Sequence, residues 1–397
     1  MKIELHMIQN FAPSCLNRDD TNSPKDCIFG GVRRARISSQ CVKRAIRRHF
    51  REQGVLPPGN LAQRTKRLVE KVTERLVETG KAADQARQVV QAALGALGLA
   101  VADDSQTQYL LFLSEVGMDE FAALCGQHWE TLVQCVGPSK PKADDQQSRR
   151  RSARKQKKAA KDAVPDDLAQ ALGVLLDGGK AADLALFGRM LADLPRQNID
   201  AACQVAHAIS THKVAMEMDF YTAVDDLKGP EEDAGAGMMG VIGYNAACFY
   251  RYAVLDWQQL LKNLGDDGDV ARRTVEAFLR ASAIAVPSGK QNTFAAHSRP
   301  DFILAIAHAS GAPLSLANAF TRPARPWGDK DLTQASVDQL AEYYKAITDV
   351  FGADGVTAQP CCGTVMPSED GTGWQPVKTL DELVVSVLAV LDQGAAS

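Results

Sequence analysis

Apolar and polar side chains alternate at the start of the chain. The apolar positions are Ile3, Leu5 and Met7, and the polar positions beside them are Lys2, Glu4 and His6. A period of two is typical of a strand that buries one face and leaves the other in water. We therefore predict a half-buried strand over Lys2–Asn10.

A strand pair and a basic helix are predicted next. Gly30 and Gly31 lie in the middle of Ile28–Ile37, which favours two strands joined by a tight turn. Ser38 or Ser39 then caps a helix. Its apolar positions recur at i, i+3, i+4 and i+7, which is the spacing of one buried helix face: Val42, Ala45, Ile46 and His49.

The middle of the chain has a helical pattern. We expect helices within Asn60–Ala102 and Met118–Val136, because apolar residues recur there at helical spacing. The following segment, 139–163, holds ten Lys or Arg against three acids and contains no Leu, Ile or aromatic residue. It cannot build a core and is predicted to be disordered, as a solvated loop or as an auxiliary nucleic-acid contact.

Strand patterns return after this block. They cover Gln204–Ile209, Val214–Val224, Ala246–Leu255 and, broken at Pro300, Thr293–Ala309. Gly-rich Asp225–Asn245 is typical of a protruding hairpin.

Three helices are expected towards the end of the chain. Val270–Ile284 forms one, and the capping boxes Ser336-x-x-Gln339 and Thr379-x-x-Glu382 open the other two. With strands on both sides of a helical block, the pattern predicts an α+β fold that has one discontinuous sheet domain.

Composition narrows the class of protein. The 397 residues are 45% hydrophobic and 23% charged, which is ordinary for a globular chain and excludes collagen-like or wholly disordered proteins. Nine scattered cysteines without a CxxC pair indicate a reduced, cytoplasmic protein. We expect no secretory signal and no membrane span, since the most apolar stretch, Ala92–Ala102, is too short to cross a bilayer.

Several catalytic and cofactor motifs are excluded by their context. Gly235–Gly240 matches GxGxxG, but an acidic loop precedes it and a strand follows, the reverse of a dinucleotide site. Ser288–Lys290 lacks the remaining residues of a P-loop, although Lys290 could still contact a phosphate. His207 and His212 lack the spacing of metal ligands on one helix face. We predict no catalytic residue, metal or cofactor.

The strongest signal is a local excess of positive charge. Although the net charge of the chain is −3, the segment Asn17–Arg48 holds nine cations against Asp19, Asp20 and Asp26: Arg18, Lys25, Arg33, Arg34, Arg36, Lys43, Arg44, Arg47 and Arg48. The arginine-rich turn leads into a helix N-terminus, where free amides favour phosphate. Binding of an RNA or DNA backbone and a solvated helix face paired with Asp19 and Asp20 both remain open.

A second signal is the pair Met238 and Met239 between glycines, with Phe220 and Tyr221 on the other arm of the hairpin. Such side chains on a protrusion often belong to a core or an interface. The alternative is a wedge that separates stacked bases.

In these motifs the chain closely resembles the CasC family, the backbone subunits of the type I-E CRISPR surveillance complex Cascade. The segments that carry the resemblance are Ser14–Asp20, Ile28–Gly31, Arg33–Gln40, Lys43–Ala45, Ala206–His212, Asp219–Leu227, Phe249–Ala253, Gly289–Ala296 and Pro313–Phe320. They are collinear and cover nearly the whole chain.

The resemblance implies a hand-shaped α+β fold of the RAMP superfamily. It has an RRM-like (ferredoxin-like) palm, an inserted helical fingers domain and a β-hairpin thumb. In this chain the palm would comprise 1–58 and 186–397, the fingers 59–185 with the basic loop 139–163, and the thumb hairpin 219–246.

The resemblance also implies a function. CasC-type subunits are not enzymes: they stack head to tail along a CRISPR RNA, contact other Cascade subunits, and meet target DNA through the guide. Guide contacts would come from Arg18, Lys25, Ser38, Gln40, Lys43 and Arg47, to which the basic cluster and the glycine loop add Arg34, Arg36, Arg44 and Lys290. The kink where each thumb flips out a base would be lined by Met190, Tyr221, Thr222, Met238 and Met239.

Two departures from the family pattern and two alternatives accompany this hypothesis. The basic segment 139–161 is an apparent insertion, and the Met-Met tip lies in a lengthened loop.

An RNA-processing enzyme would need an acid and base, or metal-binding carboxylates, near the basic helix, where Asp19 and Asp20 are the nearby carboxylates. A generic single-strand-binding protein would bind arbitrary strands without partner subunits.

Overall fold

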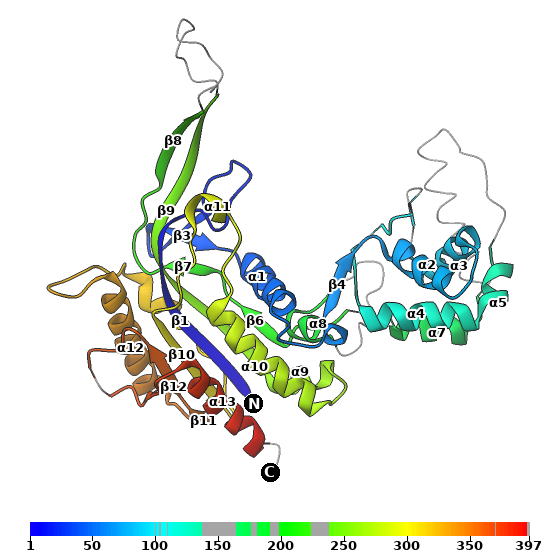
Figure 1. Ribbon diagram of the computed structural model, residues 1–397. Coiled ribbons are helices and arrows are strands. Elements are labelled where there is room, and N and C mark those ends of the chain that lie inside the picture. Colours follow the sequence, from blue (N-terminus) through cyan, green and yellow to red (C-terminus); the bar gives the residue numbers. More distant parts are fainter. Residues whose placement is uncertain are drawn as a thin grey trace, which may run out of the picture. The chain divides into compact units, whose positions relative to one another are not determined.

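The computed structural model describes residues 1–99, 101–102, 105–108, 110–136, 164–175, 181–190, 198–223, 238–369 and 371–394 (Figure 1). The predicted basic segment 139–163 lies outside these residues. The predicted α+β class is confirmed, because a large sheet and many helices are present.

The chain divides into two compact units. Unit 1 comprises Met1–Gln53, Cys203–Gln258 and Arg272–Ser397, and unit 2 comprises Gly54–Ala202 and Gln259–Ala271. The expected domain boundaries, 1–58, 59–185 and 186–397, remain predictions.

Unit 1 is built on one large sheet. Its path runs β13-β12-β10-β1-β9-β7-β3-β2, with β11 paired to β10 and with β6 and β8 paired to β9. The strands are β1 (Lys2–Ser14), β2 (Asp26–Phe29), β3 (Val32–Ile37), β6 (Cys203–Val205), β7 (Ala208–Ser210), β8 (Glu217–Ala223), β9 (Met238–Asp256), β10 (Phe302–His308), β11 (Val356–Ala358), β12 (Pro360–Gly363) and β13 (Gln375–Pro376).

The first strand is buried on both faces, so the prediction of a half-buried strand was wrong. β1 lies between β9 and β10 in antiparallel register, with Met7 opposite Arg251. Glu4 and His6 are 0% exposed. Their polar side chains are accommodated in hydrogen bonds rather than in water, a possibility that periodicity alone cannot reveal.

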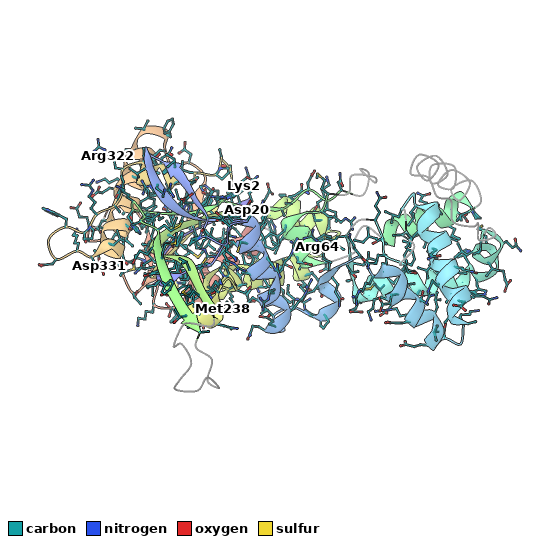
Figure 2. All side chains as sticks on the ribbon, turned by 90° about the horizontal axis from the view of Figure 1, so that it is seen from above. Lys2, Asp20, Arg64, Met238, Arg322 and Asp331 are labelled. Carbon is teal, nitrogen blue, oxygen red and sulfur yellow. The ribbon has the colours of Figure 1, made fainter. Side chains whose placement is uncertain are left out.

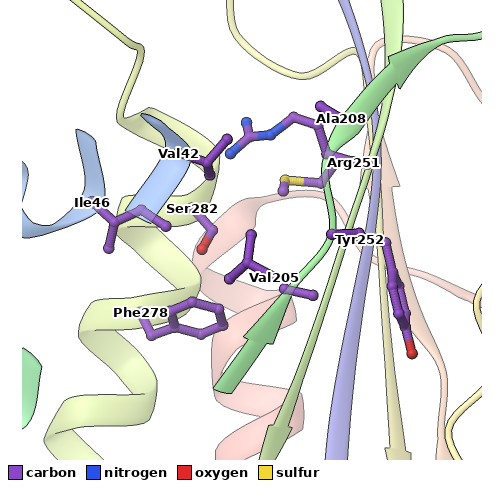
Figure 3. A pocket seen from close by; sticks show the side chains of 11 residues that line it. Val42, Ile46, Val205, Ala208, Arg251, Tyr252, Phe278 and Ser282 are labelled. Atoms are coloured by element: carbon purple, nitrogen blue, oxygen red, sulfur yellow. The ribbon is translucent and has the colours of Figure 1, made fainter. Parts of the chain in front are cut away.

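Helices cover the two faces of this sheet. On one face, α12 (Leu332–Phe351) packs Val337 and Leu340 against strand residues such as Tyr250. On the other, α1 (Ser39–Glu52) and α10 (Gly268–Ile284) enclose a small pocket that Ile46, Phe278 and the buried Arg251 line (Figure 3). Smaller helices are α9 (Trp257–Asn263), which like α10 spans the boundary between the units, α11 (Gln291–Phe294), η3 (Ala317–Thr321) and α13 (Leu380–Gly394).

One predicted helix cap was wrong and one is confirmed. The N-cap of α12 is Asp331, whose side chain accepts from Gln334 N. Ser336 lies inside the helix, where its hydroxyl bonds to Leu332 O at 2.7 Å. Thr379 does cap α13, since its hydroxyl accepts from Glu382 N at 3.1 Å.

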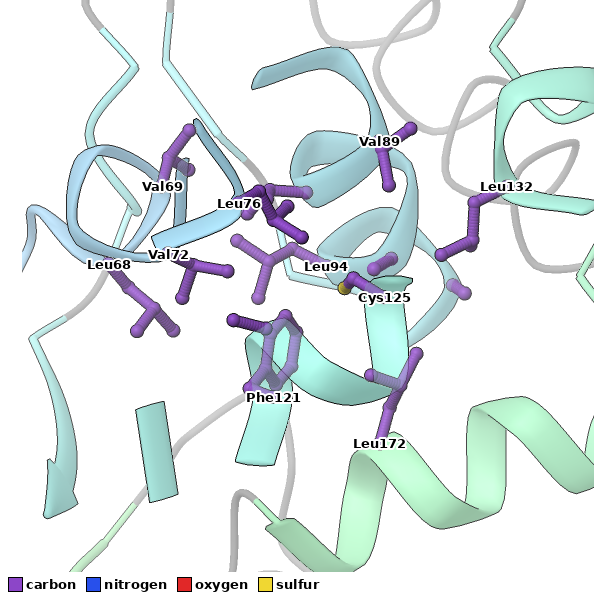
Figure 4. Close-up of a cluster of buried hydrophobic side chains, with 14 of the residues drawn as sticks. Leu68, Val69, Val72, Leu76, Val89, Leu94, Phe121, Cys125, Leu132 and Leu172 are labelled. Atoms are coloured by element: carbon purple, nitrogen blue, oxygen red, sulfur yellow. The ribbon is translucent and has the colours of Figure 1, made fainter. Parts of the chain in front are cut away.

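Unit 2 is mainly helical around its own core. Leu76, Leu94 and Phe121, all at most 1% exposed, pack together there (Figure 4). Its elements are η1 (Pro58–Asn60), β4 (Ala62–Thr65), α2 (Leu68–Glu78), α3 (Ala83–Ala96), β5 (Leu111–Ser114), α4 (Glu115–Gln127), α5 (Trp129–Gln134), α7 (Asp166–Leu175) and α8 (Ala182–Phe187). The β4–β5 pair was missed, because a four-residue strand gives almost no periodic signal.

The described residues contain no membrane-spanning helix and no disulfide. Among them, none of the helices is both long and apolar enough to pass through a bilayer. All nine cysteines lie in described segments, and each is a free thiol.

Candidate nucleic-acid interface

Four of the five Lys and Arg side chains of α1 gather on one side of the helix. At about 100° per residue, they lie within an arc of about 100°, opposite the buried Val42 and Ala45. This arc contains Gln40, Lys43, Arg44, Arg47 and Arg51, which are exposed or half-buried. Arg51 was not predicted, although its i+4 spacing from Arg47 would have identified it.

The N-terminus of α1 is held open towards solvent by the preceding loop. Asn17 ties the loop to the helix: its side chain accepts from Ser38 N at 2.8 Å, and its carbonyl accepts from Lys25 N at 2.9 Å. Ser38 caps the helix by accepting from Cys41 N. The amides of Ser39 and Gln40 have no partner among the described residues, and such amides at a helix start attract anions.

Two cations from separate segments border this loop. Gly289 lies so close to Cys15 and Leu16 that a Cβ there would overlap their carbonyl oxygens. This contact brings Lys290, at φ 49°, to the loop. Burial raises the pKa of the Cys15 thiol, while nearby Arg18 and Lys290 lower it, so both cations lie within electrostatic reach of Cys15.

Lys43 is the member of the basic face that burial affects most clearly. Burial lowers its pKa, the Cys203 thiol opposes that shift, and Arg47 lowers the pKa further. A cation that is partly desolvated beside another cation gains when an anion binds. Lys43 and Arg47 therefore form the part of the face best suited to a phosphate.

Arg36 is partly engaged within the protein. Its guanidinium donates to Asp26 O at 3.2 Å and lies 2.9 Å from His207 Nδ1. Burial lowers the pKa of His207, and Arg36 lowers it further, so His207 is a neutral acceptor for Arg36. The side chain stays half-exposed beside Lys25.

Arg34 corrects a prediction. It is 0% exposed and donates to four backbone carbonyls, at 3.2 Å to Phe29 and Ser210, 2.8 Å to Thr211 and 2.6 Å to Phe320. A guanidinium that is enclosed in this way has no face left for a phosphate. Arg34 ties the β2–β3 hairpin to the segments after β7 and around η3, and it is not an RNA contact.

Other charges of the cluster are paired. Arg33 contacts Asp26 at 2.6 Å and Arg48 contacts Glu52 at 2.7 Å. Asp19 orders its own loop by accepting from Thr21 N and Ser23 N at 2.9 and 3.0 Å.

The hairpin formed by β8 and β9 carries the predicted thumb residues on two different faces. Directly paired residues share a face, and Thr222 pairs with Met239 while Tyr221 pairs with Gly240 and Ala223 with Met238. Thr222 and Met239 therefore lie on one face, and Tyr221 and Met238 on the other. The connecting residues 224–237 lie outside the described part of the chain.

The two faces of the hairpin differ in chemistry. The face of Met239 is apolar and exposed, with Met218, Phe220 and Val241 at 61–62%. The opposite face carries Glu217 and Asp219, and the Tyr221 ring lies where a Cβ on Gly240 would be. Sequence analysis named Phe220 but could not assign it to a face, because the strand register was unknown.

Met190 belongs to unit 2. It is 85% exposed and follows Arg189, which is 6% exposed and bridges to Ile199. The Arg189 guanidinium also reaches Phe112 O at 3.4 Å. Buried neighbours thus hold the backbone of Met190 while its side chain projects into solvent.

No metal centre is seen in the described segments, where no three His, Cys, Asp or Glu side chains are grouped as ligands. His212 bonds within unit 1, through Nδ1 to Lys213 O and through Nε2 to Cys248 N.

Comparisons with known proteins identify the family. A family model described as "CT1975-like protein" matches residues 3–385. The chain belongs to the CT1975-like family. No curated protein matches it.

Solved structures add to this CT1975-like assignment. A chain of "CRISPR RNA-guided surveillance complex, pre-nicking" is 31% identical, with a TM-score of 0.83 over 98% of this chain and 100% of that one. A chain of "CRISPR RNA-guided surveillance complex" is 25% identical, with a TM-score of 0.72 over 98% and 100%. The predicted resemblance to subunits of CRISPR surveillance complexes is thereby confirmed.

Proposed function

We propose that this CT1975-like protein is a non-catalytic backbone subunit of a type I-E Cascade complex that binds the sugar-phosphate backbone of a CRISPR RNA. The observation that carries the proposal is the α1 face, where Lys43, Arg44 and Arg47 follow the free amides of Ser39 and Gln40. Backbone amides and long cations bind phosphates without reading bases.

Sequence-independent binding suits a subunit that must accept any guide. Phosphate contacts fix the strand and leave base edges free to pair with target DNA. In this proposal the guide supplies specificity, and the protein supplies position and charge. Arg18, Lys25, Arg36 and Lys290 continue the basic surface beyond the helix.

The hand-like division of the family fits the two units. We assign the palm to the sheet of unit 1, the fingers to the helices of unit 2, and the thumb to the β8–β9 hairpin. The palm, fingers and thumb boundaries 1–58, 59–185, 186–397 and 219–246 remain predictions.

The apolar face of the hairpin is the side proposed to meet RNA. Glu217 and Asp219 on the other face would repel phosphates. Phe220 and Met239 instead offer side chains that can lie against or between bases. Tyr221 and Met238 then support the hairpin from behind, and Thr222 keeps the role predicted for it.

An enzymatic function has less support from the site. The enzyme hypothesis needs free carboxylates near α1, whereas Asp19 accepts bonds from its own loop, and the hydrogen bond from Thr21 lowers its pKa. This use of Asp19 favours an ordering role. If the purified assembly cleaved a guide precursor or target, and both Asp19→Ala and Asp20→Ala abolished that cleavage, an enzymatic function would be supported instead.

The first experiment is to co-express the tagged chain with its neighbouring genes and a CRISPR array, then sequence the nucleic acid that co-purifies. Repeat-flanked spacer RNA of one length, in a complex containing several copies and other Cascade subunits, is the expected result. Heterogeneous RNA, or none, would contradict the proposal and favour a generic single-strand binder.

The basic face is tested by Lys43→Ala with Arg47→Ala. We expect weaker assembly on every spacer. The slope of log K against log salt concentration should become shallower by about 1.4, because each lost phosphate contact on a single strand changes it by about 0.7. Arg48→Ala is the control, because that arginine lies on the same helix but is paired with Glu52. A defect confined to particular spacers would contradict backbone binding.

A further inference from the structure

An exposed tryptophan projects from unit 1 in a loop that the proposed function does not use. Trp327 is 81% exposed, whereas Trp129, Trp257 and Trp374 are at most 9% exposed. It lies in the protruding loop between η3 and α12, bounded by Arg322 and Asp331, which Figure 2 labels at the edge of the molecule. Its exposure distinguishes Trp327 from the three buried tryptophans and leaves the ring accessible to a ligand.

The loop holds Trp327 in a fixed position. Trp327 and Lys330 exchange both backbone hydrogen bonds at 3.1 Å around Gly328, at φ 58°, which makes a two-residue hairpin turn. Lys330 Nζ is anchored to Asp338 at 2.7 Å. Because the tryptophan is presented on a tight, anchored turn, little conformational entropy is lost when a flat ligand stacks on it.

The other end of the loop is anchored as well. Ala324 N donates to Thr211 O at 2.9 Å, and Gln339 donates to Arg322 O at 2.9 Å. Pro323 and Pro326 restrict the backbone between these anchors and the tryptophan. The exposed Trp327 is therefore a feature of an ordered loop.

Two arginines accompany the tryptophan. Arg322 and Arg325 are exposed, and neither guanidinium has a hydrogen-bond or ion-pair partner among the described residues. The nearby acids are mostly occupied, since Asp331 caps α12 and Asp338 binds Lys330. The hydrogen bond with Asp338 raises the pKa of Lys330, and Glu342 and Glu369 lie close enough to raise it further. Arg322 and Arg325 are therefore the cations of this loop that present positive charge beside the aromatic face.

We propose that this loop, Arg322–Asp331, is a second nucleic-acid site that binds an unpaired stretch of a strand. A base stacks on Trp327, and Arg322 and Arg325 contact the flanking phosphates. A flat aromatic ring with adjacent cations is the combination that binds single strands without reading sequence. The site is separate in sequence from α1 and stands independently of the guide-binding proposal.

The fluorescence of Trp327 can report the binding of an oligonucleotide to this loop. Because the other three tryptophans are buried, a collisional quencher such as acrylamide reports mainly on Trp327 in the full-length chain. The titration uses short oligothymidylate and oligouridylate on the Lys43→Ala, Arg47→Ala background, so that binding at α1 contributes little. Comparing the two oligonucleotides tells whether DNA or RNA occupies the site.

We expect oligonucleotide to quench the tryptophan emission and to protect the remainder from acrylamide, in a salt-dependent way. Trp327→Ala, which removes this reporter, should weaken the background binding about tenfold when binding is followed with a dye-labelled oligonucleotide. Arg322→Ala with Arg325→Ala should lower the salt slope by about 1.4. Phe351→Ala is the matched control, since Phe351 is an equally exposed aromatic at the far end of α12.

Two results would overturn the proposal. One is unchanged Trp327 emission at oligonucleotide concentrations that saturate the protein with intact Lys43 and Arg47. The other is protection of Trp327 that grows with protein concentration in the absence of nucleic acid, which would assign the loop to a protein contact. Neither result bears on guide co-purification, so failure here is distinguishable from failure of the proposed function.

Discussion

Glu4 is a buried carboxylate whose removal should measurably destabilise unit 1. It accepts hydrogen bonds from Tyr252 at 2.8 Å and from Leu314 N at 3.0 Å, and it lies 2.5 Å from His308 Nε2. His6 lies on its other side at 3.5 Å. The carboxylate thus connects β1 to β9, to β10 and to the segment after β10.

The stabilisation follows from the titration of Glu4. Burial raises the pKa of Glu4, but interactions with His308 and His6 outweigh burial and bring the pKa from 4.5 down to about 2. At about 1.4 kcal/mol per unit, the ionised carboxylate contributes about 3 kcal/mol to folding. Because the folded-state pKa is lowered, this stability is present above pH 4.5 and is lost as the pH falls towards 2.

Glu4→Gln tests this value by urea unfolding of the full-length chain, followed by fluorescence. The variant should be about 3 kcal/mol less stable at pH 7, and the gap to wild type should fall to about half at pH 3. Glu52→Gln is the control, since its exposed i,i+4 pair with Arg48 should contribute less than about 0.5 kcal/mol. A loss at Glu4 that is small, or equal at both pH values, would refute the reasoning.

Two further substitutions test structural roles near the proposed RNA surface. Arg34→Lys should destabilise unit 1 by at least about 2 kcal/mol in urea unfolding, because one ammonium cannot donate to all four carbonyls. Arg33→Lys is the control and should change the stability little, because Arg33 belongs to an exposed ion pair. Equal effects of the two substitutions would contradict the structural role of Arg34. Gly240→Ala should displace the Tyr221 ring and increase proteolysis of the β8–β9 hairpin, and adding Tyr221→Ala should restore resistance; no change from Gly240→Ala would mean that the ring does not lie on that glycine. Gly268→Ala is the control, since its Cβ would meet no atom within 4 Å.

Local signals in the sequence predicted much of the architecture. The Gly30–Gly31 turn is present, and a Cβ on Gly30, at φ 60°, would overlap the Thr321 carbonyl oxygen. The α1 cap at Ser38 and the end of α12 before Gly352 also lie where sequence chemistry places them. These features depend on a few neighbouring residues, and so a single sequence suffices to locate them.

Features that depend on distant partners could not be predicted. Glu4 and His6 alternate with apolar residues as in a surface strand, yet partners more than 240 positions away bury them. The thumb residues divide between two faces because of a register that only the pairing of β8 with β9 fixes. The exposure of Trp327 could not be predicted from the sequence, since a tryptophan is usually buried and only the fold shows that this one lies in solvent.

The charge of the basic segment illustrates how folding selects among candidate contacts. Of its nine cations, Arg34 is enclosed by carbonyls, while Arg33 and Arg48 are paired with carboxylates. The other six cations are exposed or half-buried: Arg18, Lys25, Arg36, Lys43, Arg44 and Arg47. Three of these, Lys43, Arg44 and Arg47, lie on one arc of α1 beside free amides. The local density of positive charge at the helix start is therefore kept, although three of the nine cations are enclosed or paired elsewhere. Phosphate binding depends on local charge density, so this arrangement on α1 supports the proposed contact with a nucleic-acid backbone.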